Sequence, residues 1–293
     1  MLSDFFRTVS FPLCICAALF LSTTQAAELE LAKYDGRFSF SKEEVIIQQL
    51  CDRIPGLEQY YVDIGAHDGV GWSNTARLAL AGWVGFAIEG DRNLVAKFSE
   101  TYRNIPNVKV FHTFATPLNV CELLKSQNVP HNFGVLSIDI DSYDYFVLEA
   151  LLKEFRPAII VSEINEKIPP PLEFTVMFEE GWEWDYSQFY GQSISQLHKL
   201  CKKEEYGIVA MEYNNVILID KELFSGPFLS PEEALYQGYL GRQDHLILFP
   251  WNEDYEWLHR TSPEEAKSFI HHLFAPYSGK YQLELPEDSE ASL

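Results

Sequence analysis

A glycine-rich turn follows the first predicted strand. The run YYVDI at 60–64 is β-branched, aromatic and apolar, which is typical of a buried strand, and the motif DIGAHDG at 63–69 closes it. Glycines at this position let the backbone turn sharply and approach a ligand, while the next helix directs its amides toward that ligand. The same spacing also occurs in purely structural turns. The candidate ligand-binding residues of this turn are Asp63, Gly65, Ala66, His67 and Gly69.

A carboxylate ends the second predicted strand. The run VGFAI at 84–88 is followed by Glu89 and Gly90, which we add to the candidate binding residues. A carboxylate at such a strand tip can accept hydrogen bonds from both hydroxyls of a ribose. Glu89 and the glycine turn together predict an adenosine-type ligand, although neither motif says which one. The alternative is a surface acid that happens to end a strand.

Oxygen-bearing side chains also end two later strands. The segment SIDIDSYD at 137–144 puts Asp139 and Asp141 on one face of an extended chain, and Glu163 and Asn165 end the fifth strand. Ligands of open α/β sheets bind at the carboxyl ends of strands, so these side chains are expected to converge. Oxygen ligands suit Mg²⁺ or another hard cation, although helix caps and hydrogen bonds to ligand amines use the same carboxylates. The candidate catalytic residues are Asp139 and Asp141, and the candidate metal ligands are Asp139, Glu163 and Asn165.

The elements that must position these residues alternate regularly between strand and helix. Such alternation demands right-handed crossovers and a parallel sheet with helices on both faces. Two strands close around Tyr213-Asn214-Asn215, a connection so short that they must be antiparallel. A dinucleotide dehydrogenase would instead continue with parallel units. The predicted strands are 60–64, 84–88, 108–111, 134–138, 158–161, 206–212 and 216–219, and the predicted helices are 73–81, 93–102, 118–126, 145–155 and 193–203.

Capping patterns and composition organise the rest of the chain. Ser or Thr followed three residues later by Glu or Gln marks a helix start, as at Ser41, Ser193, Ser230 and Ser262. Residues 165–191 carry three prolines and many aromatic residues without periodicity, which predicts a long inserted loop. Such a loop forms either a lid over a ligand or a satellite hydrophobic cluster. The predicted units are a helical extension at 27–59, the main α/β domain at 60–222, a C-terminal helical appendage at 223–282 and a disordered acidic tail at 283–293.

The first 26 residues have the pattern of a secretory signal peptide. Arg7 is their one basic residue, and an apolar run at 11–21 precedes small residues at 24–26. This run is too short for a stable membrane span. We therefore expect a protein that is exported or held at a membrane by this segment, or a cytoplasmic one if the start codon is misassigned. Cys51, Cys121 and Cys201 are too widely spaced for a disulfide framework or a metal site, and we expect free thiols, with one pair still open in an exported protein.

The charge of the chain limits its partners. With 43 acidic and 22 basic residues, the formal net charge is -21. Such a surface repels the phosphates of nucleic acids and the anionic face of a membrane. We expect a small-molecule acceptor, such as a glycan, and no nucleic-acid partner. The sequence gives no indication of oligomeric state.

Residues 60–220 resemble the FkbM-type family of S-adenosylmethionine-dependent methyltransferases. The matching motifs are VDIGAHDG at 62–69, GWVG at 82–85 with IEGD at 88–91, IDID at 138–141 with YDY at 143–145, and YGQS at 190–193. The resemblance implies a Rossmann-like class I methyltransferase sheet, mostly parallel with a terminal antiparallel hairpin, followed by C-terminal helices. It also implies that Asp63, Gly65 and Gly69 hold the methionine part of S-adenosylmethionine and that Glu89 holds its ribose. Two departures are His67, where the general class I loop has a glycine, and Ser142-Tyr143 in place of a Gly-Asn pair.

These observations predict a methyltransferase that methylates an oxygen on a small, sugar-like or hydroxylated acceptor. Methyl transfer from a sulfonium is an in-line displacement in which a base need only take the proton of the acceptor. We expect Asp139 to act as this base or as a metal ligand, and His67 is an alternative base. Two other classes remain open: a nicotinamide-dependent oxidoreductase, and an exported binding protein without catalysis. The second is motivated by the signal segment, because S-adenosylmethionine is made in the cytosol.

Overall fold

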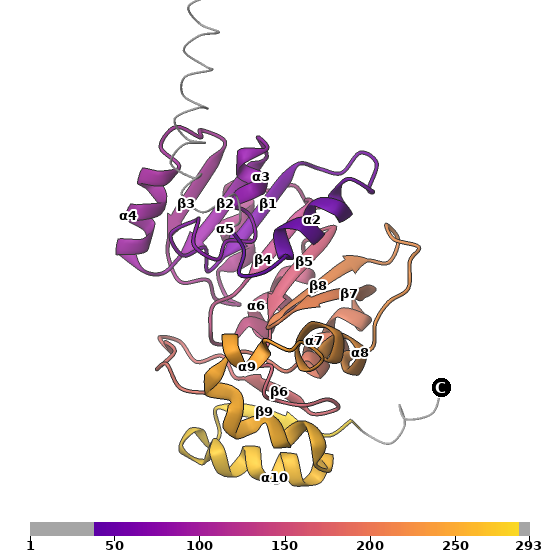
Figure 1. The fold of residues 1–293 in the computed structure, drawn as a ribbon. Helices are drawn as coiled ribbons and strands as arrows, with labels where there is room; N and C mark the ends of the chain where they lie inside the picture. Colours follow the sequence, from indigo (N-terminus) through magenta and orange to yellow (C-terminus); the bar gives the residue numbers. More distant parts are fainter. Residues whose placement is uncertain (1–37, 287–293) are drawn as a thin grey trace, which may run out of the picture.

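A seven-stranded sheet forms the centre of the protein (Figure 1). The computed structural model describes residues 38–286, so the predicted signal segment at 1–26 lies outside the described residues. The strand order is β3-β2-β1-β4-β5-β8-β7, in which β8 runs antiparallel to both of its neighbours and the other pairs are parallel. This order, closed by the predicted hairpin, is the Rossmann-like sheet of the class I methyltransferases.

The strands of the sheet lie within one or two residues of their predicted positions. Each is a short apolar or β-branched run that ends at a turn or at a polar residue, as buried parallel strands do. The hairpin is the one predicted around Asn214, and its strands carry a register shift between Ile208 and Ala210. The strands are β1 Tyr60–Ile64, β2 Val84–Glu89, β3 Val108–His112, β4 Val135–Ile138, β5 Ile159–Glu163, β7 Tyr206–Glu212 and β8 Asn215–Asp220.

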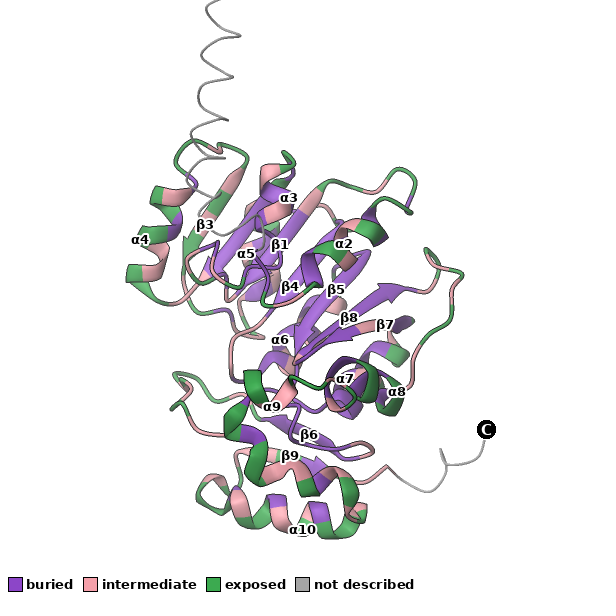
Figure 2. Ribbon diagram, in the orientation of Figure 1, coloured by how far each residue is buried: buried purple, intermediate pink, exposed green. Residues whose placement is uncertain are grey.

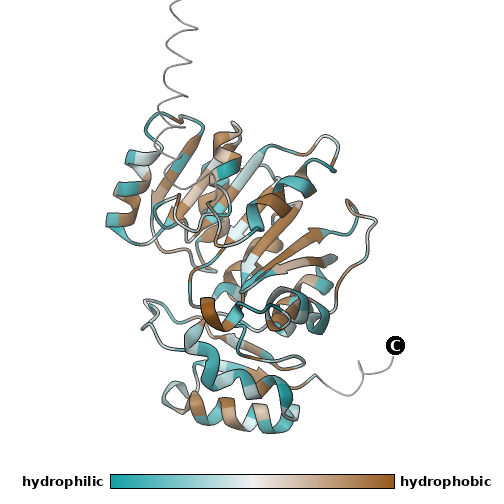
Figure 3. Cartoon of the chain, in the orientation of Figure 1, coloured by the Kyte–Doolittle hydropathy of each residue, from teal (hydrophilic) through white to brown (hydrophobic). Residues whose placement is uncertain are grey.

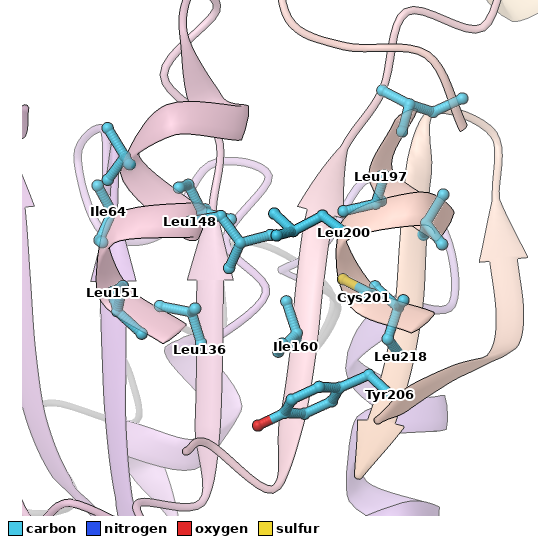
Figure 4. Packing of buried hydrophobic residues seen from close by; sticks show 14 of the residues in the cluster. Ile64, Leu136, Leu148, Leu151, Ile160, Leu197, Leu200, Cys201, Tyr206 and Leu218 are labelled. Carbon is cyan, nitrogen blue, oxygen red and sulfur yellow. The ribbon is translucent and has the colours of Figure 1, made fainter. Parts of the chain in front are cut away.

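Helices cover both faces of the sheet because its side chains alternate between two cores. Val62 and Ile64 of β1 pack into the core beneath α5, α6 and α7, whereas Tyr61 packs into the core beneath α2 and α3. Figure 2 shows the central strands buried and the edge strand β3 more exposed, and Figure 3 shows β4, β5 and β8 mostly apolar. Figure 4 shows Leu148 and Leu151 of α6 against β4 and β5. Burying each such side chain stabilises the fold by about 1.5–3 kcal/mol. These helices are α2 Glu43–Cys51, α3 Ala76–Leu80, α4 Arg92–Thr101, α5 Val120–Ser126, α6 Asp144–Leu152 and α7 Ile194–Lys203.

Three of the four predicted helix caps form. Ser230 and Ser262 make reciprocal capping boxes with Glu233 and Glu265, and the Ser193 side chain accepts a hydrogen bond from the amide of Gln196. The C-terminal helices that begin at the first two caps are α8 Pro231–Leu235 and α10 Pro263–Leu273. Between or after them lie α9 His245–Leu248, a π-helical turn at Tyr236–Leu240 and 3₁₀-helical segments at Pro250–Arg260 and Ala275–Tyr277.

The predicted capping box at Ser41 and Glu44 is wrong. The Ser41 hydroxyl donates to the carboxylate of Glu212 at 2.7 Å, and Glu44 accepts from the amide of Phe38 and pairs with Arg77. Partners brought in by tertiary packing replace the local ones here.

The predicted helix at 73–81 is shorter than expected. The Ser73 side chain accepts hydrogen bonds from the amides of Thr75 and Ala76, so the chain forms a turn before α3 begins. A serine side chain competes for backbone amides in this way and delays the helix.

A second, smaller lobe lies at one end of the sheet (Figure 1, lower part). Its core is formed by the segment at 168–189, α10 and the strand β9 Tyr281–Glu284, which pairs antiparallel with β6 Glu173–Val176. The inserted loop therefore contains a strand, and Leu283, assigned to the disordered tail, is buried in β9. Neither strand was predicted, because the two partners lie about a hundred residues apart. Residues 287–293 of the predicted tail lie outside the described residues.

Two predictions about the chain as a whole concern membranes and thiols. None of the helices within residues 38–286 has the length and apolar character needed to cross a membrane. Cys51, Cys121 and Cys201 are free thiols, as expected from their spacing.

Candidate functional site

A cavity of about 810 Å³ opens at the carboxyl ends of β1, β2 and β4. This is where open α/β sheets bind ligands, and the volume lies in the range of ligand pockets. Gly65 and Glu89 line the same cavity, as the adenosine interpretation requires. The predicted site residues that line it are Asp63, Gly65, Ala66, His67, Glu89, Gly90, Asp139 and Asp141.

Gly65 joins the turn after β1 to the loop after β4. Its φ is +81°, in the region that favours glycine, and a Cβ at this position would lie 1.6 Å from the carbonyl oxygen of Asp139. The amides of Gly65 and Ala66 both donate to the carbonyl of Ile88, which ties the turn to β2. Only a residue without a side chain fits here.

The other positions of the turn have different roles. Gly69 does not line the cavity; its φ is +79° and the rings of Phe98 and Tyr102 occupy the space of a side chain, so its observed role is packing. His67 has a φ of +51°, which non-glycine residues seldom adopt. Its ring lies 3.5 Å from the Asp68 carboxylate and is half exposed at the cavity.

The carboxylate of Glu89 points toward the turn after β1. It accepts hydrogen bonds from the amide of His67 at 2.8 Å and from the amide of Asp91 at 2.7 Å. A carboxylate has about four acceptor positions, so two stay available for the hydroxyls of a ribose.

Asp63 lies deeper, at the base of the cavity. It is 5% exposed and accepts a hydrogen bond from the Thr75 hydroxyl at 2.6 Å. Burial raises the pKa of Asp63 to about 6, against the opposing effect of the hydrogen bonds from Thr75 and Ser137. Asn74 lines the cavity beside them, and its amide oxygen is buried without a hydrogen-bond partner among the described residues.

Three carboxyl groups meet at the tips of β4 and β5. One oxygen each from Asp139, Asp141 and Glu163 lies within 4.8 Å of the other two. Burial, followed by the charges of neighbouring acids, raises the pKa of Asp139 and of Glu163 well above their usual ranges and that of Asp141 to about 7. Such displaced values are common at functional sites.

Two residues that sequence reasoning missed hold this cluster in place. Asp144, fully buried, accepts hydrogen bonds from the amides of Ile140 and Ser142 and so shapes the loop that carries Asp141. Asn214, in the turn of the β7–β8 hairpin, donates to Glu163 Oε1 at 2.6 Å. The four-residue spacing of the first contact was visible in the sequence, whereas nothing local signalled the second.

Asn165, a predicted metal ligand, anchors the inserted loop. Its amide nitrogen donates to the carbonyls of Gln188 and Tyr190, and the residue does not line the cavity. Its Oδ1 is buried and has no hydrogen-bond partner among the described residues.

The aromatic loop supplies both a core and part of the cavity wall. Phe189 stacks on Tyr277 in the core of the second lobe, with ring centroids 4.1 Å apart. Trp182, Trp184 and Tyr186 line the cavity, and Tyr186 is 86% exposed. The satellite cluster is therefore present around Phe189, and the lid stays a prediction for the residues of the loop that line the cavity. Trp72, also at the cavity, is exposed as well.

The cavity is strongly acidic. Among the described residues that line it, Arg92 is the single lysine or arginine, and two histidines, His67 and His112, are also present. Negative charge focused in a cleft attracts cations and repels anions. The carboxylates of the lining are Asp63, Glu89, Asp91, Asp139, Asp141 and Glu183.

Comparison with known proteins gives only weak likenesses. No protein-family model matches the chain, and no curated protein matches its sequence. Among solved structures, the N-terminal domain of EvdMO1 with SAH bound is 12% identical, with a TM-score of 0.41, over 61% of this chain and 81% of that one. An O-methyltransferase from Bacillus cereus in complex with SAH is 15% identical, with a TM-score of 0.38, over 68% and 91%. A SAM-dependent methyltransferase from Aquifex aeolicus is 13% identical, with a TM-score of 0.37, over 65% and 98%.

Proposed function

We propose that this protein is an S-adenosylmethionine-dependent methyltransferase of the FkbM type that methylates a hydroxyl oxygen of a small, sugar-like acceptor. The observation that carries this proposal is the acidic cavity at the tips of β1, β2 and β4, with Gly65 and Glu89 on one wall. S-adenosylmethionine is a nucleoside with a sulfonium and an ammonium group, so its positive charge suits this lining.

The same charge counts against a nicotinamide dinucleotide. Its diphosphate would have to bind among six carboxylates with a single arginine, which is the reverse of the usual arrangement for phosphates. The antiparallel strand β8 also departs from the parallel continuation of a dehydrogenase sheet.

Each wall of the cavity has a role in the proposed reaction. Glu89 would accept the ribose hydroxyls, and Asp63 would attract the ammonium group of the cofactor. S-adenosylmethionine supplies the methyl group. On the acceptor side, an ionised Asp139 or Asp141 would take the proton of the acceptor hydroxyl as its oxygen bonds to the methyl carbon and the carbon–sulfur bond of the cofactor breaks. Most of the acceleration would come from alignment of the acceptor with the sulfonium.

The aromatic side chains at the mouth of the cavity support a sugar-like acceptor. Trp184 and Tyr186 lie in contact, with ring centroids 4.9 Å apart, and Trp72 lines the same cavity. Exposed aromatic faces with few polar groups stack well on the apolar faces of a sugar ring. A substrate of this kind is neutral, so it enters an acidic cavity without repulsion.

Calorimetry of the full chain with S-adenosylhomocysteine tests the cofactor. We expect a micromolar dissociation constant, lost in Glu89→Ala because the ribose loses its acceptor, and unchanged in Glu122→Gln, a control on an exposed face of α5. Binding of NAD without binding of S-adenosylhomocysteine would overturn the proposal.

Transfer of a tritiated methyl group tests the acceptor. The panel would contain free hexoses and deoxyhexoses, nucleoside-diphosphate sugars and a catechol. We expect label on a neutral sugar, because the acidic lining repels a diphosphate. Tight cofactor binding with no transfer to any hydroxyl compound would instead favour the binding protein without catalysis. Label on the catechol alone would refute the sugar assignment.

A further inference from the structure

The spacing of the three clustered carboxyls fits one metal ion. Their nearest oxygens lie within 4.8 Å of one another. Mg²⁺ binds oxygens at about 2.0–2.1 Å and Ca²⁺ at about 2.3–2.6 Å, so two ligands on one ion are at most about 4 Å apart around Mg²⁺ and about 5 Å apart around Ca²⁺. Asp139, Asp141 and Glu163 therefore reach a common point between them.

Glu163 has one occupied oxygen and one that is free. Oε1 accepts the hydrogen bond from Asn214, whereas Oε2 is buried and has no hydrogen-bond partner among the described residues. The residue is 7% exposed, so water reaches it poorly. An unpaired buried acceptor costs about 1–3 kcal/mol, and more when it is charged. Asn214 orients the carboxylate in the way that outer hydrogen bonds orient metal ligands.

Within residues 38–286, the neighbouring charges that act most strongly on the cluster are all acidic. The charges acting on Asp139, Asp141 and Glu163 come from one another and from further acids, of which Asp144 acts on all three. Both carboxylate oxygens of Asp144 accept hydrogen bonds from backbone amides, those of Ile140 and Ser142. Three carboxyls this close must either hold protons or bind a cation.

We propose that Asp139, Asp141 and Glu163 bind one hard divalent cation at the acceptor side of the cavity. Binding of the ion follows from the cluster, but its role rests on the proposed function. There Asp139 and Asp141 would act through the ion instead of taking the proton themselves: the ion would lower the pKa of an acceptor hydroxyl held on it, and solvent would take the proton. The oxygen would then form a bond to the methyl carbon as the carbon–sulfur bond breaks, leaving S-adenosylhomocysteine.

Manganese binding to the full chain, freed of metal with a chelator, tests the site. We expect one Mn²⁺ per chain, seen as loss of the free-ion electron paramagnetic resonance signal and reversed by excess Mg²⁺. Glu163→Gln and Asp141→Asn should each weaken binding at least tenfold. Glu183→Gln removes a carboxylate of the cavity wall outside the cluster and should leave Mn²⁺ affinity unchanged.

Thermal unfolding gives a second measurement that does not depend on activity. Mn²⁺ should raise the unfolding temperature of the unaltered chain and of Glu183→Gln, and should not raise that of Glu163→Gln. Glu163→Gln keeps an acceptor for Asn214, and Asp141 lies on a partly exposed loop, so both variants are expected to fold.

The outcomes separate this inference from the proposed function. No Mn²⁺ binding, or equal affinity in the unaltered chain and both cluster variants, would show that the carboxyls share protons instead. If S-adenosylhomocysteine binds and Mn²⁺ does not, this inference alone fails. If Mn²⁺ binds at the cluster and S-adenosylhomocysteine does not, the proposed function alone fails.

Discussion

The turn after β1 and the loop after β4 are neighbours in the sheet but use their carboxylates in different ways. Around the first, Asp68 accepts the amides of Val70 and Gly71, and Glu89 accepts two further amides. In the second, the Asp144 carboxylate accepts hydrogen bonds from two backbone amides, whereas Asp139 and Asp141 lie close to the carboxyl of Glu163.

The carboxylates around the first turn have hydrogen-bond donors within the protein, whereas those at the tips of β4 and β5 mainly face one another. Hydrogen bonds from backbone amides already hold the carboxylates of Asp68 and Glu89 in place, so this turn is shaped before a ligand arrives. The acids at the tips of β4 and β5 repel one another, which costs stability unless a proton or a cation is present. Substitutions in each of the two loops test this contrast.

Gly65→Ala should have the largest effect on stability because Gly65 lies where the turn after β1 contacts the loop after β4. The new methyl group would overlap the backbone of Asp139, and we expect a loss of about 3 kcal/mol or more in the free energy of unfolding. Binding of S-adenosylhomocysteine should be lost as well. Gly82→Ala is the matched control: its φ is +89° but nothing lies near its Cβ, so about 1 kcal/mol is expected in denaturant unfolding. Equal losses in the two variants would contradict the close approach.

Asp144→Ala and Asp68→Ala compare the two loops directly. Each carboxylate accepts two loop amides, but Asp144 is fully buried and Asp68 is partly exposed. We expect Asp144→Ala to cost about 3 kcal/mol and Asp68→Ala about 1 kcal/mol, because water replaces a lost partner only where it can reach. Urea unfolding of both variants measures this. A larger loss of stability in Asp68→Ala than in Asp144→Ala would mean that the turn after β1, and not the loop after β4, depends more on its carboxylate.

The affinity for S-adenosylhomocysteine should depend on pH through Asp63. Its pKa of about 6 means that it is mostly ionised at pH 7 and mostly protonated at pH 5. Because the ionised form attracts the ammonium group, affinity should fall about tenfold over that interval, which calorimetry measures. In Asp63→Asn the affinity for S-adenosylhomocysteine should be weak and should not change between pH 5 and pH 7. A pH profile unchanged by this substitution would remove Asp63 from the site.

The same group affects the stability of the ligand-free protein with the opposite sign. A raised pKa in the folded state means that folding favours the protonated form of Asp63. Its contribution is therefore present below about pH 4 and is lost as the pH rises through 6. The difference in the free energy of unfolding between the unaltered chain and Asp63→Asn, measured by urea unfolding from pH 4 to pH 7, gives the contribution of Asp63.

Tyr186→Ala should have the smallest effect on the fold. Its ring is 86% exposed, so the free energy of unfolding should change by less than about 0.5 kcal/mol and affinity for S-adenosylhomocysteine should stay the same. Methyl transfer to the sugar of the acceptor panel should fall, because a stacking surface is removed. Trp257→Ala, at an exposed ring outside the cavity lining, serves as the control and should leave transfer unchanged.

Much of the fold was predictable because its signals are local. The seven strands of the sheet, the hairpin around Asn214 and the caps at Ser193, Ser230 and Ser262 each depend on a few adjacent residues. The glycine turn and Glu89 lie at the ends of neighbouring strands, so topology brings them to one cavity. Periodicity and capping act within a turn or two of chain, which is why these predictions could be made without coordinates.

The rest depends on contacts between residues far apart in the chain. The pairing of β6 with β9, the hydrogen bond from Ser41 to Glu212 and that from Asn214 to Glu163 join segments from different parts of the sequence. Gly69, expected at the ligand, instead packs beneath two rings of α4 and its C-terminal end.

Local signals in the sequence are enough to place the strands and helices of the main α/β domain, the glycine turn and the acids at the strand tips, but not β6 or β9. Only the tertiary structure decided which acids meet, which are satisfied by amides, and which aromatic residues face the cavity. The physical reason is that a side chain's local preferences are set by its neighbours in sequence, whereas its partners, its burial and its charge environment exist only once distant segments have packed.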